Sequence, residues 1–232
     1  MALKIRDLGL IINGKTLVLA DFHIGLEEAM NKQGVLIPRN QFKDIADRLS
    51  RILGKEKFKK IIINGDLKHE FGIISRQEWK QTLLLLDLLS RHTEKIILIK
   101  GNHDKTIGPI AEKRKVEVLE EIFVGKILIC HGHKISPNIK KADTIIIGHE
   151  HPSISIREGA RAEKFKCFLF GKYKSKRLIV MPSFNPLAEG TDVSKEGILS
   201  PYIKNIGSFN AVVVTDSGET FDFGKIGELK NA

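Results

Sequence analysis

Residues that commonly bind metal ions follow five short apolar segments of this chain. The segments with their polar ends read LVLADFH, IIINGD, IILIKGNHD, ILICHGH and TIIIGHEH. Carboxylate, amide and imidazole donors in one set suit a divalent ion such as Mn, Fe, Co, Ni, Zn or Mg rather than a thiolate site. Clusters of this kind usually form a metal or catalytic site. The candidates are Asp21, His23, Asp66, Asn102, His103, Asp104, His131, His149 and His151.

The apolar segments have the length and composition of buried strands. In an open α/β sheet, ligands gather outside the carboxyl ends of the strands, so these distant residues should converge on one crevice. Asp21 and His23 are two positions apart, and an extended backbone would point both to the same side. His149 and His151 have the same spacing. His69 and His133 lie within three residues of Asp66 and His131.

Such a ligand set could support hydrolysis of a phosphoester. A one-step hydrolysis needs an in-line nucleophile and positive charge around the equatorial oxygens. Two ions about 3.5–4 Å apart meet both needs when they share a hydroxide. A carboxylate must hold the two ions together, and Asp66, alone at the end of its strand, is the natural bridging ligand.

The same motifs, in the same order, resemble those of the calcineurin-like metallophosphoesterase superfamily. They are Asp21-Phe22-His23, Gly65-Asp66, Gly101-Asn102-His103-Asp104, His131-Gly132 and Gly148-His149-Glu150-His151. The longer segments ADFHIGLE, GDLKHEFG, CHGH and GHEHPS are most similar to small phosphoesterases related to SbcD-type nuclease subunits. Related bacterial proteins of that group are the ligase-associated phosphoesterases.

The resemblance implies an α/β fold, a four-layer αββα sandwich of two mixed sheets flanked by helices. It also implies two divalent ions, Mn being the first expectation. Attack would come from the bridging hydroxide, with His103 as general acid and Asp104 as the carboxylate that orients it. The alternative for Asp104 is an ordinary N-cap of the following turn. The implied ligands are Asp21, His23, Asp66 and His151 for one ion, and Asp66, Asn102, His131 and His149 for the other.

Local patterns predict the elements that position these residues. Asn13-Gly14 between apolar runs predicts a hairpin with a type I′ turn. Apolar spacing from Arg39 to Leu53 predicts an amphipathic helix. Ser75 followed by Glu78 is a capping box, which predicts a second helix to about Arg91. Several strand-like runs follow His151.

Composition indicates a protein that folds as one domain over residues 1–232, because α/β domains of this length often remain single. No apolar stretch approaches 18 residues, and the N-terminal segment lacks the apolar core of a signal peptide, so a cytoplasmic protein without membrane contact is expected. The two cysteines, Cys130 and Cys167, lie in apolar runs and are interpreted as reduced packing residues.

The net charge of +10 favours polyanionic partners such as DNA or RNA. In the densest basic segment, Lys164 to Arg177, aromatic residues alternate with cations, and Lys172 and Lys174 could contact a nucleic acid. The alternative is a solvated hairpin with aromatic residues inside and lysines outside. The loop from Met181 to Ser194 is a second candidate substrate contact through Ser183 and Asn185, or else a loop fixed by its prolines.

Three functions remain open on the sequence. The first is a two-metal phosphodiesterase acting on nucleic acid or nucleotides, and the second is a phosphomonoesterase or nucleotidase with the same metal core. The third is a non-catalytic scaffold of this fold, which the intact His103 and ligand set argue against. About 80 residues follow His151, enough to complete the sandwich but little more, whereas SbcD-type subunits carry a capping domain and an ATPase-binding tail. Protein partners, an ATPase or a ligase among them, are therefore left open by the sequence.

Overall fold

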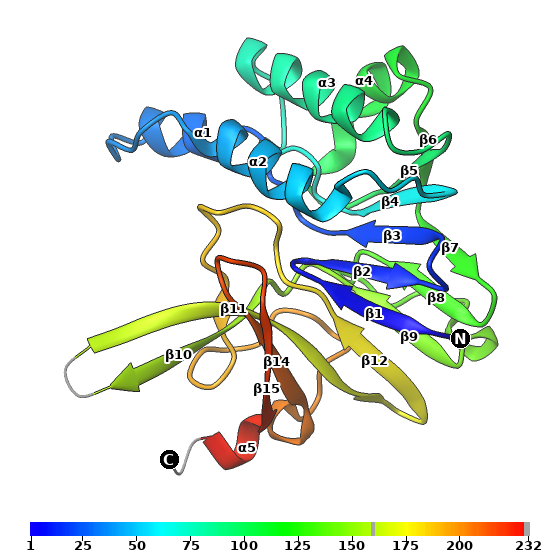
Figure 1. Ribbon diagram of the computed structural model, residues 1–232, viewed down its shortest axis with the longest axis vertical. Helices are drawn as coiled ribbons and strands as arrows, with labels where there is room; N and C mark the ends of the chain where they lie inside the picture. The colour runs from blue at the N-terminus through cyan, green and yellow to red at the C-terminus, as the bar shows by residue number, and fades with distance from the viewer. Residues whose placement is uncertain (159–160, 230–232) are drawn as a thin grey trace.

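Two β-sheets stacked on each other form the middle of the molecule (Figure 1). The computed structural model describes residues 1–158 and 161–229. The first sheet has the order β1-β2-β3-β4-β5-β6; its first three strands are antiparallel and β3 to β6 run parallel. Its strands are β1 (Leu3–Arg6), β2 (Gly9–Ile12), β3 (Thr16–Leu19), β4 (Lys60–Asn64), β5 (Ile96–Ile99) and β6 (Glu117–Leu119).

The second sheet contains the later strands: β7 (Glu121–Val124), β8 (Ile127–Cys130), β9 (Thr144–Ile147), β10 (Pro152–Glu158), β11 (Arg161–Tyr173), β12 (Lys176–Val180), β13 (Thr191–Asp192), β14 (Asn210–Val214) and β15 (Thr220–Lys225). Its main path is β13-β10-β11-β12-β9-β8-β7, with β14 joining β11 to β15. The segment β8-β9-β12 is parallel, whereas β10, β11 and β12 are antiparallel to their neighbours along the chain. The predicted pair of mixed sheets is therefore confirmed.

Helices cover the outer face of the first sheet, whereas mostly irregular segments cover that of the second. The helices are α1 (Leu26–Lys32), α2 (Gln41–Leu53), α3 (Arg76–Ser90), α4 (Gly108–Lys113) and α5 (Ile226–Leu229). Helices α1 to α4 lie over the first sheet, while the short α5 lies at the opposite end of the molecule (Figure 1). The outer face of the second sheet is instead packed by Tyr202, Ile203, Phe209 and Ile226 from irregular segments and α5. None of the described helices is long and apolar enough to cross a membrane.

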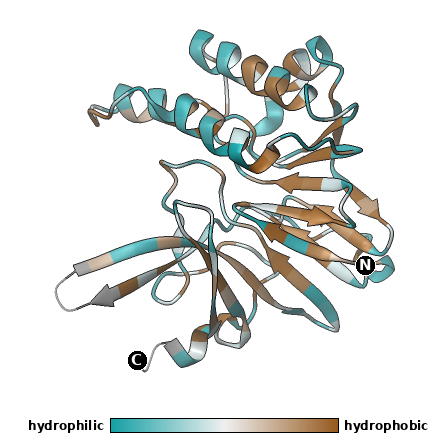
Figure 2. Ribbon diagram, in the orientation of Figure 1, coloured by the Kyte–Doolittle hydropathy of each residue, from teal (hydrophilic) through white to brown (hydrophobic). Residues whose placement is uncertain are grey.

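Strand alternation divides the apolar side chains into two cores. In β8, Ile127 and Ile129 face the core between the sheets, whereas Leu128 and Cys130 face the core on the outer side of the second sheet. All four are buried, which explains the uninterrupted apolar run in the sequence. Figure 2 shows the same brown, hydrophobic colour along the central strands of both sheets. The predicted packing role of Cys130 is confirmed, since its thiol is buried.

One local prediction is confirmed in detail and a second in part. Asn13 and Gly14 have φ values of 51° and 65°, as a type I′ turn requires, and join β2 to β3. Ser75 caps α3 by accepting a hydrogen bond from the Glu78 backbone N–H at 3.0 Å. The Glu78 carboxylate does not complete a capping box; it accepts from the backbone N–H groups of His69 and Glu70. Glu78 therefore ties α3 to the loop that follows Asp66.

Candidate metal centre

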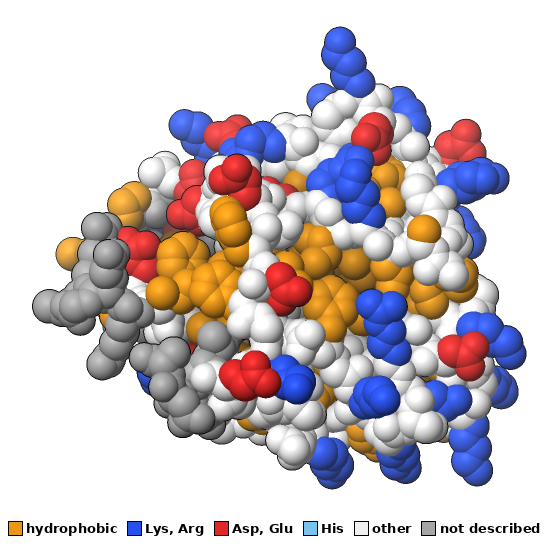
Figure 3. Space-filling view, turned by 60° about the horizontal axis from the view of Figure 1, so that its bottom comes forward, with side chains coloured by type: hydrophobic (Ala, Val, Ile, Leu, Met, Phe, Trp, Pro, Cys, Tyr) orange, Lys and Arg blue, Asp and Glu red, His pale blue; other side chains and the backbone are white. Residues whose placement is uncertain are grey.

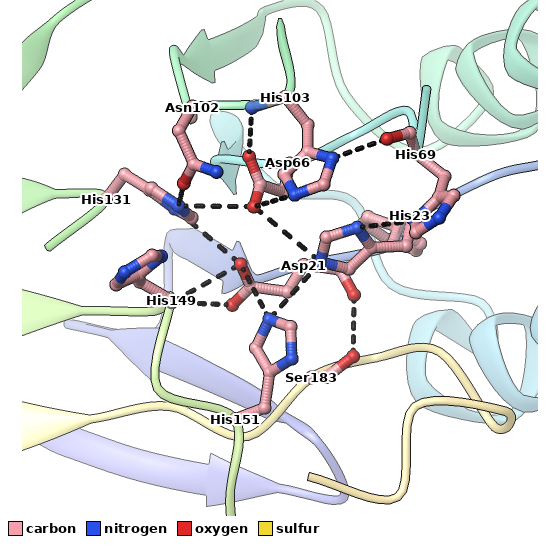
Figure 4. A network of polar contacts seen from close by, with 12 residues as sticks. Asp21, His23, Asp66, His69, Asn102, His103, His131, His149, His151 and Ser183 are labelled. Atoms are coloured by element: carbon pink, nitrogen blue, oxygen red, sulfur yellow. Dashed lines mark hydrogen bonds and ion pairs between the residues drawn. The ribbon is translucent and has the colours of Figure 1, made fainter. Parts of the chain in front are cut away.

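The predicted ligands lie just beyond parallel strands from both sheets. Asp21, Asp66 and Asn102 follow β3, β4 and β5 of the first sheet, while His131 and His149 follow β8 and β9 of the second. Figure 4 shows these side chains pointing toward one another in the space between the strand ends. Their positions at the carboxyl ends of strands predicted that these side chains would converge, and in the structure they do.

The backbone at the ligands is in an uncommon conformation. Five of them have positive φ: Asp21 (55°), His23 (42°), Asp66 (45°), His149 (66°) and His151 (48°). The extended backbone expected for the two closely spaced pairs is therefore wrong, because tight left-handed turns aim these side chains inward. Such conformations cost about 1–3 kcal/mol each and persist where the surroundings over-determine them, which is typical of functional sites.

One group of ligands joins the first sheet to the second. The Nε2 atom of His151 lies 3.3 Å from Asp21 Oδ1 and 3.3 Å from Nε2 of His23. The three donor atoms needed for an ion are thus within reach of a common point. This group matches three of the four ligands that the resemblance implies for the first ion.

A second group lies beside it. The Nε2 atom of His131 is 3.3 Å from Asp66 Oδ2 and 3.1 Å from Asn102 Oδ1. Asp66, His131 and His149 again offer donor atoms close enough for one ion. The Oδ2 atom of Asp66 also lies 3.6 Å from Nε2 of His23 in the first group. Asp66 therefore lies between the two groups, where a bridging ligand would have to be.

Backbone amides fix the two carboxylates. The His103 N–H donates to Asp66 Oδ1 at 3.0 Å, which leaves Oδ2 to face the imidazoles. The His149 N–H donates to Asp21 Oδ2 at 3.1 Å. Glycine is required beside both carboxylates, because a Cβ at Gly101 would lie 2.0 Å from Asp66 Oδ1 and one at Gly148 would lie 2.4 Å from Asp21 Oδ2. The glycines of the GNHD and GHEH motifs thus permit these close approaches.

The centre favours a positive charge between its carboxylates. Although burial alone would lower the pKa of His131, its contacts with Asp66 and Asp21 raise that pKa to about 9. Burial would raise the pKa of Asp66, but its hydrogen bond and charge interaction with His131 hold it below the ordinary value. Burial, together with the charge of His131, lowers the pKa of His149 to about 4. Burial and the neighbouring His151 hold the pKa of His23 well below 6.5.

These properties fit divalent cations. Asp21 and Asp66 are almost fully buried, and within the described residues neither forms an ion pair with a lysine or arginine. A buried carboxylate needs a compensating charge, and among the described residues the ion-pair partners of these two carboxylates are imidazoles. Neutral imidazoles and carboxylates are also the ligands that Mn, Fe, Co and Zn accept. The donor set therefore suits the two-ion centre that the resemblance implies.

His103 lies at the edge of the centre. Its Nε2 atom is 3.9 Å from Asp66 Oδ2, and its Nδ1 atom is in close contact with the backbone carbonyl of His69. A carbonyl only accepts hydrogen bonds, so Nδ1 must carry its proton, and Nε2 is the atom that gains or loses one. His69 was not among the expected site residues, although its position three residues after Asp66 was a sequence signal.

Asp104 does not orient that imidazole. Its carboxylate accepts from the backbone N–H of Gly101 at 3.0 Å, from Leu67 at 3.1 Å and from Lys68 at 3.4 Å. Burial raises its pKa to about 6. These hydrogen bonds differ from the expected orienting contact with His103. They also differ from the alternative, an N-cap of the following turn, because the donors precede Asp104 or lie in the loop after β4. Asp104 holds the loops after β4 and β5 together.

Ser183 and Asn185 also have a different role from the one expected. Both are buried, so they are not placed to contact a substrate. The Ser183 hydroxyl donates to the carbonyl of Asp21 at 2.8 Å, and the Asn185 amide donates to the carbonyls of Phe22 and His23 at 2.9 and 3.0 Å. These residues hold the turn that carries two ligands, and the expected substrate contact is corrected to a positioning role.

Lys166 holds the loop that contains Ser183 and Asn185. It belongs to the segment for which a solvated hairpin with outward lysines was one interpretation. Its ammonium instead donates to the carbonyl of Ser183 at 2.8 Å and contacts that of Asn185. Burial lowers its pKa to about 7. The alternating pattern of β11 places it on the face of the strand that points toward the ligand turn, which residue type alone does not reveal.

Lys172 and Lys174 lie at the wrong end of the sheet to contact the centre. Lys172 is opposite Arg177, which is in turn opposite Thr144 at the start of β9. The candidate ligands His149 and His151 follow the other end of β9, after Ile147. These two lysines therefore do not reach the metal centre, and their expected contact with a long nucleic acid stays a prediction. On the face shown in Figure 3, basic side chains are spread around the periphery while hydrophobic ones gather in the middle.

Comparison with known proteins assigns the family. The sequence model of the family described as calcineurin-like phosphoesterase matches residues 14–178, and the chain belongs to this family. No match is found among curated proteins. Nuclease MPE from Pseudomonas putida has a similar structure, with a TM-score of 0.68, 19% sequence identity, and coverage of 96% of this chain and 95% of that chain. At this identity the likeness shows the fold alone.

Two further solved structures are more distant. Vps29 from Entamoeba histolytica, complexed with zinc, has a TM-score of 0.39 and 18% identity, covering 90% of this chain and 99% of that chain. A predicted phosphoesterase from Streptococcus pneumoniae has a TM-score of 0.37 and 16% identity, covering 90% of this chain and 97% of that chain.

Proposed function

We propose that this protein is a two-metal phosphodiesterase that acts on nucleic acid or nucleotides. The observation that carries the proposal is the position of Asp66. Its Oδ2 atom lies 3.6 Å from Nε2 of His23 and 3.3 Å from Nε2 of His131, between two groups of ligands that come from both sheets. A buried bridging carboxylate flanked by imidazoles is what a two-ion hydrolytic site requires.

Seven side chains would hold the ions. When bound, two divalent ions supply positive charge for the phosphoryl oxygens and lower the pKa of the attacking water. The protein contributes the fixed positions of the ligands, which the strained turns and buried hydrogen bonds around them maintain. The proposed sets are Asp21, His23, Asp66 and His151 for one ion, and Asp66, Asn102, His131 and His149 for the other.

His103 is the proposed general acid. The His69 carbonyl fixes the proton on Nδ1, so the imidazolium form of His103 carries a second proton on Nε2, on the side that faces Asp66. From Nε2 this proton can be transferred to the oxygen of the departing alcohol. A positioned acid of this kind contributes typically 10²–10⁴-fold to the rate, and most for leaving groups that need a proton.

Two observations support a diester of nucleic acid as substrate. One solved structure that shares this fold, with a TM-score of 0.68, is a nuclease. The chain also carries a net charge of +10, which attracts polyanions and makes their binding sensitive to salt. Neither observation identifies a contact surface, so the proposal rests on the chemistry of the centre and takes the substrate class from these two indications.

The test compares two ester types on one preparation. Protein stripped of metal by a chelator is reloaded separately with Mn, Fe, Co, Ni, Zn or Mg and assayed on bis-p-nitrophenyl phosphate and p-nitrophenyl phosphate. We expect activity to depend on added metal and to favour the diester, and single-stranded DNA to compete with it at low salt. Faster hydrolysis of the monoester, without competition by DNA, would favour a phosphomonoesterase. Metal binding without hydrolysis of either ester would refute both enzymatic functions.

A further inference from the structure

An exposed aromatic ring lies directly against the proposed general acid. Phe71 is 54% exposed, and the centroid of its ring is 3.7 Å from that of His103 with an angle of 32° between the planes. The ring of His69 stacks near the same imidazole at 5.4 Å and 27°. Phe71 thus has one part of its surface against His103 and a large part open to solvent at the mouth of the centre.

The loop that carries Phe71 is held in place from several sides. The Glu78 carboxylate accepts from the backbone N–H of His69 and of Glu70 at 2.9 and 3.0 Å. On the other side of Phe71, the Thr106 hydroxyl donates to the carbonyl of Gly72 at 3.1 Å. A large apolar side chain exposed on an anchored loop is already placed for contact, so little ordering would be lost when a ligand binds to it.

The chemistry of His103 defines which part of a substrate would reach this ring. The acid must be near the oxygen that departs, so a group attached to that oxygen leaves the centre on the side of His103 and Phe71. An aromatic face recognises planar rings by stacking, and it does so for any nucleobase because every base has a π-face. The phenyl ring has no hydrogen-bonding group with which to distinguish one base from another.

We infer that Phe71 is a stacking platform for the base of the departing nucleotide. The inference rests on the proposed function and adds to it a preference for leaving groups that carry a base. It differs from a purely structural role for Phe71 in holding His103, because a structural role would affect every substrate equally. Stacking affects only substrates whose departing sugar carries a base.

The test uses dinucleotides with identical scissile bonds. The first dinucleotide carries thymine on both sugars. In the second and third, one of the two sugars is replaced by a tetrahydrofuran that has no base, at a different position in each. The leaving oxygen therefore remains comparable in all three. Product analysis identifies the departing sugar. Base stacking is worth about 1–3 kcal/mol, or roughly a 5- to 150-fold effect on binding. We expect Phe71→Ala to lower kcat/KM by that factor when the departing sugar carries thymine, and to have little effect when it does not.

Two variants serve as controls. Phe71→Trp keeps an aromatic face and should retain the preference. Ile73 lies in the same loop, and its apolar side chain is 95% exposed. Ile73→Ala should therefore leave kcat/KM unchanged for all three dinucleotides. Equal losses on the three dinucleotides for Phe71→Ala would overturn the inference in favour of a role through His103. No loss on any of them would overturn it outright.

A binding measurement separates this inference from the proposed function. Trp79 is the only tryptophan, so Phe71→Trp in a Trp79→Phe background places a single fluorophore at the platform. In the presence of a chelator, the thymine dinucleotide should quench its fluorescence, and the dinucleotide that lacks the departing base should not. Equal quenching by both would refute stacking. Failure of the wild-type protein to cleave any diester with any metal would refute the function, while the quenching result would still decide the stacking.

Discussion

Asn185 offers the sharpest test of how the centre is built. Its amide donates to two buried backbone carbonyls, those of Phe22 and His23, at 2.9 and 3.0 Å. These carbonyls belong to the turn in which Asp21 and His23 have φ values of 55° and 42°. We predict that Asn185→Ala destabilises this turn and thereby weakens metal binding, although Asn185 itself contacts no proposed ion.

The magnitude follows from the two lost hydrogen bonds. A buried acceptor left without a donor costs about 1–3 kcal/mol, and this applies to the Phe22 carbonyl. The His23 carbonyl still accepts from Gln41 Nε2 at 3.2 Å and from the Leu26 N–H at 3.1 Å, so its loss is that of one hydrogen bond, about 0.5–1.5 kcal/mol. An entering water would restore part of this stability. The same turn is strained, so part of the loss would appear as relaxation of the ligands away from their positions. Removing a residue that supports metal ligands typically costs 10–100-fold in affinity. We expect both effects in the same variant.

Two measurements check this prediction. Chemical denaturation in the presence of a chelator gives the free energy of unfolding without metal, and calorimetric titration with Mn or Zn gives the affinity. Asn31→Ala is a matched control, because Asn31 donates a comparable hydrogen bond to the backbone carbonyl of Glu27 at 2.8 Å in α1. Unchanged metal affinity in Asn185→Ala, with an increase in KM alone, would refute the positioning role and restore a substrate contact.

Four further outcomes are expected. Asp66→Asn should reduce both the number of bound ions, measured by metal analysis, and hydrolysis by orders of magnitude; normal turnover with two ions would contradict its bridging role. His103→Ala should keep both ions but lose turnover, most on esters with basic leaving groups, and loss of an ion would make His103 a ligand. The pKa of His131 is raised from 6.5 to about 9, so its contribution to stability is complete below pH 6.5 and disappears as the pH rises through 9. Because the lowered pKa of Lys166 acts in the opposite direction over the same range, the check is the difference in melting temperature between the wild type and His131→Asn in a chelator. This difference should shrink as the pH rises from 6.5 to 9, and an increase would contradict the assignment. Finally, Lys172→Glu with Lys174→Glu should leave hydrolysis of small diester reporters unchanged, because these lysines lie at the far end of the sheet; a large loss would contradict that placement.

Much of the fold could be predicted because its signals are local. A turn such as Asn13-Gly14 is specified by the two residues that tolerate positive φ, and the start of α3 by a single side chain, Ser75, that caps a backbone amide. The uninterrupted apolar runs indicate strands buried on both faces. The convergence of Asp21, Asp66 and His131 also follows from the sequence, because each residue ends a predicted strand and parallel strands end on one side.

Other features depend on contacts between segments far apart in the chain. Ser183 and Asn185 occur in a polar loop that resembles a substrate contact, and only the packing of that loop against Phe22 and His23 turns them inward. Asp104 is next to His103 in sequence, yet its carboxylate is used by backbone amides from the loop after β4. Neighbours in sequence indicate which groups are close, but not which hydrogen-bonding partner is nearer.

The sequence by itself indicated the candidate ligands, because metal chemistry restricts which side chains can serve and the ends of predicted strands fix their positions. The tertiary structure decided what surrounds those ligands. It placed Lys172 and Lys174 at the opposite end of the sheet, turned Lys166 inward, and brought Phe71 and His69 against His103. Each of these outcomes depends on the register between strands or on a loop held by a distant side chain, and no local pattern of residues encodes such long-range contacts.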